Sequence, residues 1–416
     1  MKENLRILSI KKQNKRIDID FQVSDGLKKY FRPERHFFLE YSFDVSSVPS
    51  SIAIVPILCN LLQISWLTDS IIWVDELDYD FYHCILRLKN AFQEMYPQFR
   101  LGGTLIAARL EKNRSSTMQE ALLLFTGGVD ATTSMLRNRE KRPILFNTNG
   151  WYSSSPNEEN PVYEADTIAI NSIGASNDLD TCFVKSNFAT FINADAVNRA
   201  FGKKTGSTWW FGFQHSVAFI GCAMVAAYYK GARSVYIASS YTFGQYIICV
   251  SDPRIDSEIR CAGIETVHDG YELSRQDKVR LIVQYQNNTN REIKLRVCSF
   301  NTHNCCKCEK CFRTMLALLS EGAKDVSLFG FELDKDFLDA LKEFIQTSAM
   351  ELDHDHAVFW KDIIERMRIN YDSMYRKDVY EYLKTIDFSQ AKRNAVINHY
   401  RKDYKEILRR KLRLNR

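Results

Sequence analysis

Four cysteines lie close together in the sequence at a spacing that is typical of a metal site. They are Cys298, Cys305, Cys308 and Cys311. Two consecutive Cys-x-x-Cys steps bring sulfur atoms together around an ion with metal–sulfur bonds of about 2.3 Å. Four thiolates leave no open coordination position, so we predict a structural Zn²⁺ ion and no metal-activated water. An iron–sulfur cluster and reduced thiols are the alternatives, and neither Cys306 nor His303 is expected to be a ligand.

A pair of glycines marks a second candidate site, for phosphate. Gly127 and Gly128 stand between the apolar segment 121–125 and a polar helix start. Consecutive glycines allow a tight turn that directs backbone N–H groups toward an anion, and the positive end of the next helix adds to this attraction. Thr126 supplies a hydroxyl donor, and Asp130 is able to hold Mg²⁺ against the phosphates. For these residues alone, an ordinary α/β turn is the alternative.

Aromatic residues precede a long predicted helix, 213–230. Trp209 and Trp210 are candidates for stacking on a purine-like ring, because aromatic side chains pack well against planar ligands. His215, at the start of the helix, is a candidate contact for phosphate or for a developing anion. The alternative is that the tryptophans belong to the core and that His215 caps the helix.

Polar candidate residues stand at the end of a predicted buried strand, 234–240, and in the segment after it. Ser240 stands at its end, and ligands of open α/β sheets lie beyond the carboxyl ends of the strands. Asp252 or Asp256 is a candidate for binding Mg²⁺ or an incoming amine, and ordinary turn acids are the alternative. His268 is interpreted as the end of a strand and not as a catalytic partner of Asp269, because adjacent residues of an extended chain face opposite ways.

The composition is that of a globular protein. The chain has 416 residues, of which 45% are apolar, and only 17 are Gly and 8 Pro; it therefore predicts two or three folded units and excludes disordered and fibrous classes. The net charge of +5 resides in the tail 401–416, where eight basic residues face two acids. The N-terminus has no signal-peptide core, and the longest apolar stretch, 216–229, is shorter than the roughly 20 residues that a membrane helix needs. We expect a cytoplasmic protein without membrane contact.

The apolar pattern predicts an α/β fold with an open, mostly parallel sheet that has helices on both faces. Three units are expected: an N-terminal α+β domain with its own core (1–115), the α/β domain (116–333), and a C-terminal helical region with the basic tail (334–416). The predicted strands of the α/β domain are 121–125, 143–147, 166–171, 234–240 and 293–299. The predicted helices are 132–141, 213–230 and 276–286, and Ser274 with Asp277 predicts a capping box before the last of them.

The segment TGGVDATTS, residues 126–134, resembles the phosphate loop of the PP-loop ATP pyrophosphatase superfamily, whose usual form is S-G-G-x-D-S. In that superfamily the loop binds the pyrophosphate of ATP, and AMP is transferred to a carboxyl or carbonyl oxygen. The resemblance implies an adenine nucleotide alpha-hydrolase-like fold with ATP and Mg²⁺. Ala131 stands where the family has its last Ser, and Thr132 is the substitute hydroxyl. The residues expected at the nucleotide are Phe125, Thr126, Gly127, Gly128, Val129, Asp130, Thr132, Phe146 and Ser240, and those expected in catalysis are Asp130, His215 and Asp256.

Two longer segments, 264–282 and 295–318, narrow the resemblance. IETVHDGYELSRQDKVRLI and LRVCSFNTHNCCKCEKCFRTMLAL are similar to a group of bacterial relatives of the 7-cyano-7-deazaguanine synthase family. The synthases convert a 7-deazaguanine carboxylic acid to the nitrile with ATP and ammonia and carry this zinc knuckle, whereas most of the relatives have no assigned substrate. The resemblance implies an ATP-dependent ligase that releases pyrophosphate. The acid it implies is a 7-deazapurine acid, and the amine is ammonia or an amine of a protein partner, since this group includes members of antiviral defence clusters.

Two other functions fit the same residues. A PP-loop enzyme that modifies tRNA would use the basic tail to bind RNA phosphates, and this nucleic-acid partner is the less favoured. A degenerate PP-loop protein would bind nucleotide as a scaffold or sensor, with Ala131 as the mark of lost turnover.

Overall fold

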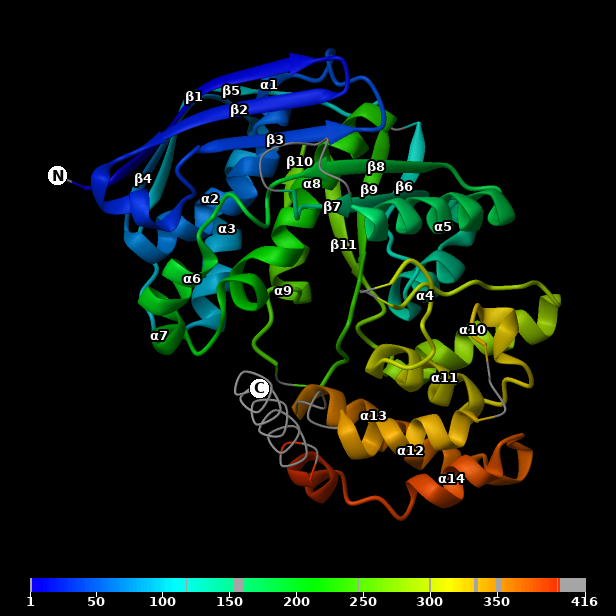
Figure 1. The fold of residues 1–416 in the computed structure, drawn as a ribbon. Helices are drawn as coiled ribbons and strands as arrows, with labels where there is room; N and C mark the ends of the chain where they lie inside the picture. The colour runs from blue at the N-terminus through cyan, green and yellow to red at the C-terminus, as the bar shows by residue number, and fades with distance from the viewer. Residues whose placement is uncertain are drawn as a thin grey trace, which may run out of the picture. The chain divides into compact units, whose positions relative to one another are not determined.

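The computed structural model describes residues 2–116, 118–152, 160–245, 247–298, 301–332, 336–348, 354–394 and 396 (Figure 1). The basic tail 401–416 lies outside the described residues. The chain divides into two compact units, one formed by residues 1–126 and 130–272 and the other by 127–129 and 273–416. These boundaries differ from the expected ones at 115 and 333.

The first unit is built on a single sheet of eleven strands among its described residues, in the order β10-β11-β9-β6-β7-β8-β3-β2-β1-β4-β5. Strands β11, β9, β6, β7 and β8 are parallel to one another, as are β1, β4 and β5. The predicted α/β class with an open, mostly parallel sheet is confirmed. The strands are β1 (Asn4–Gln13), β2 (Arg16–Val23), β3 (His36–Tyr41), β4 (Ile71–Asp78), β5 (Thr104–Glu111), β6 (Gln119–Leu124), β7 (Ile144–Asn149), β8 (Thr181–Ser186), β9 (Ala232–Ala238), β10 (Arg260–Cys261) and β11 (Ile264–Asp269).

Helices cover both faces of the parallel part of the sheet. Alternate residues of a strand point to opposite faces, and β6 shows the consequence: Leu122 belongs to one apolar cluster, whereas Leu123 belongs to another with Met135 and Ile170. The first cluster includes α2 and α8, and the second includes α4 and α5. The helices of this unit are α1 (Ser50–Ala53), α2 (Val55–Thr68), α3 (Tyr79–Met95), α4 (Val129–Arg137), α5 (Pro161–Asn177), α6 (Ala194–Val197), α7 (Lys203–Thr205), α8 (His215–Lys230) and α9 (Pro253–Asp256).

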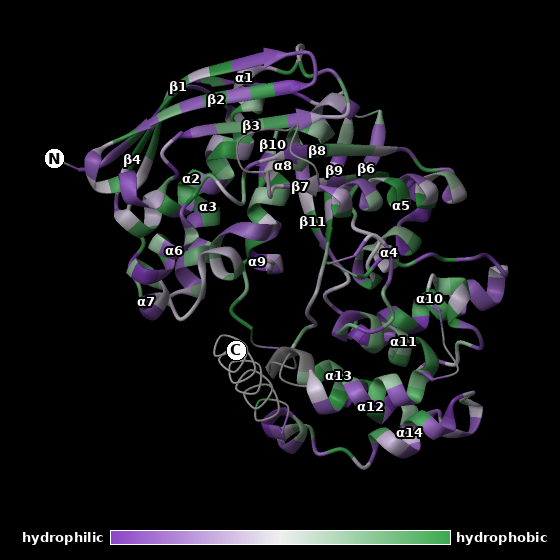
Figure 2. Ribbon diagram, in the orientation of Figure 1, coloured by the Kyte–Doolittle hydropathy of each residue, from purple (hydrophilic) through white to green (hydrophobic). Residues whose placement is uncertain are grey.

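The N-terminal segment does not have the separate core that the sequence suggested. Its strands β1 and β2 alternate hydrophobic and hydrophilic residues (Figure 2), as expected for an antiparallel sheet with one buried face. However, β3 pairs with β8, with Leu39 opposite Ser186, and one apolar cluster runs from Leu5 to Ile264. The correction has a physical reason, because local periodicity predicts strands but not their distant partners.

Helices α2 and α8 approach each other closely within this common core. A Cβ atom added at Gly221 would lie 2.8 Å from the Cβ atom of Cys59, so only glycine allows the contact. The continuous helical stretch Trp210–Lys230 is long and apolar enough to cross a membrane by length and composition, but 78% of its apolar window is buried inside the protein. It is the single such helix among the described residues, and its burial is that of a core helix.

The second unit is helical in its described parts. The predicted capping box is confirmed, since Ser274 and Asp277 exchange side-chain and backbone hydrogen bonds at the start of α10. The helix α11 contacts the C-terminal helices, because Trp360 Nε1 donates to Glu309 Oε1 at 3.0 Å and Arg366 pairs with Glu321 at 3.2 Å. The helices are α10 (Arg275–Thr289), α11 (Glu309–Ser320), α12 (Phe337–Thr347), α13 (His354–Ile369) and α14 (Lys377–Leu383).

Two predicted strands are wrong. Residues 166–171 lie inside α5, which begins earlier because the side chain of Asn160 caps it and Pro161 occupies its first turn. The described part of 293–299 is not assigned as a strand. Its N–H groups at Ile293 and Leu295 instead donate to Leu328 and Phe329 of a short 3₁₀ turn, so the ladder hydrogen bonds of a strand do not form.

A histidine between two carboxylates makes the stability of the first unit depend on pH. His36 Nε2 lies 2.9 Å from Asp18 and Nδ1 lies 3.1 Å from Asp20. The hydrogen bond to Asp18 raises the pKa of His36 above its usual 6.5, despite partial burial. Burial raises the pKa of Asp18, but hydrogen bonds from His36 and Arg16 outweigh this effect and lower it to about 2.

The sign of the expected pH dependence follows from these shifts. The contribution of His36 is fully present below pH 6.5 and is lost as the pH rises through its raised pKa, whereas that of Asp18 is lost as the pH falls from 3.8 through about 2. We expect the urea midpoint of the wild type to decline as the pH rises through the raised pKa of His36, and His36→Asn to remove this decline. Exposed His83 is the control: His83→Asn keeps the decline, and an unchanged slope in His36→Asn would contradict the assignment.

Candidate functional site

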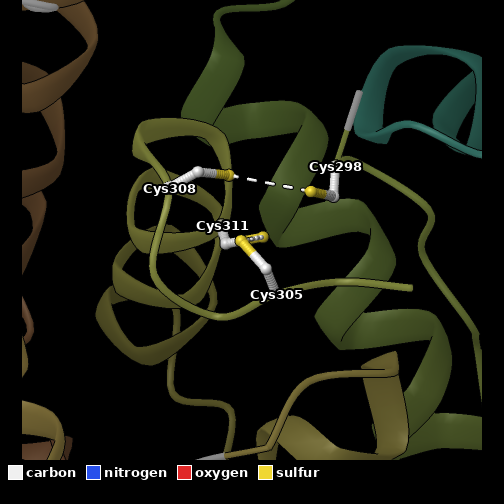
Figure 3. Close-up of side chains that lie close together, drawn as sticks. All are labelled: Cys298, Cys305, Cys308 and Cys311. Carbon is white, nitrogen blue, oxygen red and sulfur yellow. Dashed lines mark hydrogen bonds between the residues drawn. The ribbon is translucent and has the colours of Figure 1, made fainter. Parts of the chain in front are cut away.

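The four predicted metal ligands meet at one point in the second unit. The sulfur atoms of Cys298, Cys305, Cys308 and Cys311 all lie within 4.8 Å of one another, and Figure 3 shows them directed toward a common centre. A tetrahedral zinc site with bonds of about 2.3 Å needs sulfur–sulfur distances of about 3.8 Å. Two of the pairs are at 4.0 Å. The donor set and its geometry therefore fit a structural Zn²⁺ ion.

Residues between the first two ligands hold the loop in shape. Asn304 Oδ1 accepts from the backbone N–H groups of Val297 and Cys298 at 3.0 and 3.3 Å. Its Nδ2 donates to the carbonyl oxygens of Leu295 and Gly330 at 2.8 and 2.9 Å. The side-chain amide of Asn304 thus ties the loop to the segment before it and to Gly330, and this keeps Cys298 near the later cysteines.

The helix α11 places the last two ligands. Cys308 is its N-cap and Cys311 lies in its first turn, where the positive helix end favours a thiolate. The hydrogen bond from Cys311 lowers the pKa of Cys308 to about 5, which favours the ligating form. Cys306 points elsewhere, as expected: its φ is 56°, and its sulfur accepts from the Glu332 N–H at 3.3 Å.

The glycine loop lies between β6 and α4. Gly127 has a φ of 77°, a left-handed conformation that glycine adopts without strain. The loop is anchored at its start, because Phe125 N–H donates to Phe146 O at 2.8 Å and Asn147 Nδ2 donates to Phe125 O at 2.9 Å. The N–H of Arg296 donates to Gly127 O at 2.8 Å. The glycine turn and the helix start that phosphate binding requires are both present.

The residues expected at the nucleotide fall into two groups. Thr126 is exposed, and Gly128 and Asp130 are partly exposed. In contrast, the side chains of Phe125 and Phe146 are 1% and 0% exposed and belong to the apolar clusters. A contact of Phe125 or Phe146 with a nucleotide is therefore expected through the backbone.

The hydroxyl residues at the start of α4 are buried in the first unit. Thr132 and Thr133 are each 1% exposed, and Ser134 is 2% exposed. Ser134 Oγ donates to Asp269 Oδ2 at 2.5 Å, which joins α4 to the carboxyl end of β11. Ser240 is exposed two residues after the end of β9. Since β6, β9 and β11 are parallel neighbours, these residues follow the same edge of the sheet.

Asp256 is the centre of a buried polar cluster. His268 Nδ1 lies 2.8 Å from Asp256 Oδ2, and the two side chains are 1% and 0% exposed. Ser216 Oγ donates to Asp256 Oδ1 at 2.7 Å, and Ser251 Oγ to Oδ2 at 3.3 Å. Sequence reasoning missed His268, because its partner is the acid twelve positions earlier and not the adjacent Asp269.

His215 lies beside this cluster and among aromatic rings. Its Nδ1–H donates to Trp210 O at 3.0 Å, and its Nε2 lies 3.9 Å from Cys249 Sγ. Burial lowers the pKa of His215, which favours the neutral ring. Trp209 is 1% exposed and stacks on Phe213, so it belongs to the core.

One exposed tryptophan was missed by the sequence analysis. The Trp210 ring lies 4.9 Å from that of Trp151, which is 57% exposed. Trp151 stands two residues after β7, and its position beyond a parallel strand is the signal that would have identified it. The pair presents an aromatic surface that suits a planar ring.

Comparison with known proteins adds no family assignment. No protein-family model matches the sequence, and no curated protein matches it.

Proposed function

We propose that this protein is an ATP-dependent enzyme that adenylates a carboxylate, releases pyrophosphate and passes the acyl group to an amine. The proposal is carried by the loop from Thr126 to Asp130, in which left-handed Gly127 and then Gly128 precede the nine-residue helix α4. It is supported by the sequence resemblance to PP-loop enzymes over 126–134 and by the four-cysteine site that the related synthases share. Its proposed setting is the cytoplasm.

The reaction needs little side-chain chemistry from the protein. A substrate carboxylate oxygen attacks the α-phosphorus of ATP, and the bond to pyrophosphate breaks. The backbone N–H groups of the glycine loop bind the departing pyrophosphate and orient it for in-line displacement. Asp130, partly exposed in the first turn of α4, is the carboxylate that would hold Mg²⁺, which neutralises phosphate charge when bound.

The amine completes the reaction by attacking the acyl-adenylate carbonyl and displacing AMP. Ammonia or an amine of a protein partner supplies the nucleophile. The pair of Trp151 and Trp210 favours an acid with a planar heteroaromatic ring, such as a 7-deazapurine acid. Zinc bound by four cysteines has no open position and keeps the fold of the second unit.

Pyrophosphate release tests the proposal. We expect the protein to release pyrophosphate from ATP and Mg²⁺ with 7-deazaguanine-7-carboxylate, and Asp130→Asn to slow this step by roughly 100-fold, because phosphate charge is then left unneutralised. The matched control is Glu140→Gln, an exposed acid in the turn after α4, which keeps the wild-type rate. Intact ATP binding without pyrophosphate release across a panel of heteroaromatic acids would favour the scaffold function instead.

A further inference from the structure

The buried pair of Asp256 and His268 has the geometry of a proton acceptor. The Asp256 carboxylate accepts hydrogen bonds from His268, Ser216 and Ser251. It is therefore fixed in place from three directions, by α8, by the turn before α9 and by β11. A carboxylate held in this way sets the ring orientation and the tautomer of its histidine.

The other ring nitrogen of His268 is buried and makes no hydrogen bond to the residues that the structure describes. With Nδ1–H donating to Asp256 at 2.8 Å, the neutral ring presents Nε2 as an acceptor. Leaving a buried polar atom unsatisfied costs roughly 1–3 kcal/mol, and a catalytic role is one explanation for such an atom, besides an ordered water, an ion or stored strain.

The position of His268 in the sheet agrees with a catalytic role. It is the penultimate residue of β11 and lies opposite Ile237 of the parallel strand β9. The chain beyond β9 continues to exposed Ser240, and Ser239 N–H donates to Asp269 O at 2.8 Å. Ligands of open α/β sheets bind beyond this edge.

We propose that His268 is the general base of the acyl-transfer step and that Asp256 is its positioning residue. This inference rests on the proposed function. The amine nitrogen forms a bond to the acyl carbon, the bond from that carbon to the AMP oxygen breaks, and AMP leaves as an anion. The proton of the amine moves to Nε2 of His268, where Asp256 stabilises the resulting imidazolium, and then passes to solvent.

The test separates the two half-reactions. In His268→Asn, the amide keeps a donor toward Asp256 but removes Nε2. With ATP, Mg²⁺ and 7-deazaguanine-7-carboxylate, we expect pyrophosphate release in the first turnover to stay within about twofold of the wild type, while transfer to ammonia falls by roughly 10²-fold or more. Hydroxylamine is a stronger nucleophile that is unprotonated at neutral pH, and its adduct is acidic enough to lose its proton to water. It should therefore react at near wild-type rate without His268.

Asp256→Asn provides a second variant, because it keeps Nε2 but disturbs its orientation. We expect a smaller loss, about tenfold, again with ammonia and not with hydroxylamine. His83→Asn, on the exposed side of α3, is the control and changes neither rate.

Equal losses with ammonia and hydroxylamine would show a structural role and overturn the inference, as would unchanged ammonia transfer. A wild type without pyrophosphate release would instead refute the proposed function and this step with it.

Discussion

Replacement of Cys308 by serine is expected to release zinc and to unfold the second unit. Cys308 supplies one of four sulfur ligands, and its sulfur lies 4.0 Å from that of Cys298. Structural zinc contributes about 10 kcal/mol or more to the folding of small metal domains. Because typical domains have unfolding free energies of only about 5–15 kcal/mol, loss of one ligand is enough to destabilise residues 273–396.

Cys306→Ser is the matched control for this experiment. Cys306 is in the same loop, but its sulfur accepts from Glu332 and lies outside the ligand set. Metal analysis should find one zinc per chain in the wild type and in Cys306→Ser, and little in Cys308→Ser. Limited proteolysis should then cut Cys308→Ser within 273–396. Bound iron, or equal zinc loss in both variants, would refute the assignment.

Replacement of Asp78 by alanine is expected to be the most destabilising single change in the first unit. Asp78 is 0% exposed, and its carboxylate accepts from the N–H groups of Phe81 and Ala262 and from Asn113 Nδ2, all at 2.9–3.0 Å. It therefore caps α3 and joins it to the turn between β10 and β11. Alanine leaves buried donors unsatisfied, for a total loss of about 3–5 kcal/mol.

Urea unfolding measures this loss directly. The control is Asp75→Ala, an exposed acid on the same strand β4, which should shift the unfolding free energy by less than about 0.5 kcal/mol. If Asp78→Ala unfolds at the same urea concentration as Asp75→Ala, the carboxylate does not join the two segments.

The sequence predicted features that depend on neighbouring residues. The spacing from Cys298 to Cys311, the glycine turn at Gly127 and the capping box at Ser274 are local signals, and the structure contains each of them. In each case the physical cause acts within a few residues.

Features that depend on distant residues were missed. The pairing of Leu39 with Ser186 leaves no trace in local periodicity. His268 was set aside because it cannot face the same way as Asp269, which is correct, but its carboxylate partner comes from α9. The Asn160 cap and Pro161 decided that 166–171 is helical, although its apolar residues alternate as in a strand.

The pairing of β3 with β8 has a consequence for the order of folding during synthesis. Residues 36–41 leave the ribosome long before 181–186, so until then β3 presents an unpaired edge with buried-type residues such as Phe37 and Leu39. Sheet edges of this kind recruit other chains, and contacts so far apart in sequence form slowly. Protection by a chaperone therefore matters most during synthesis, while β3 has been made and β8 has not.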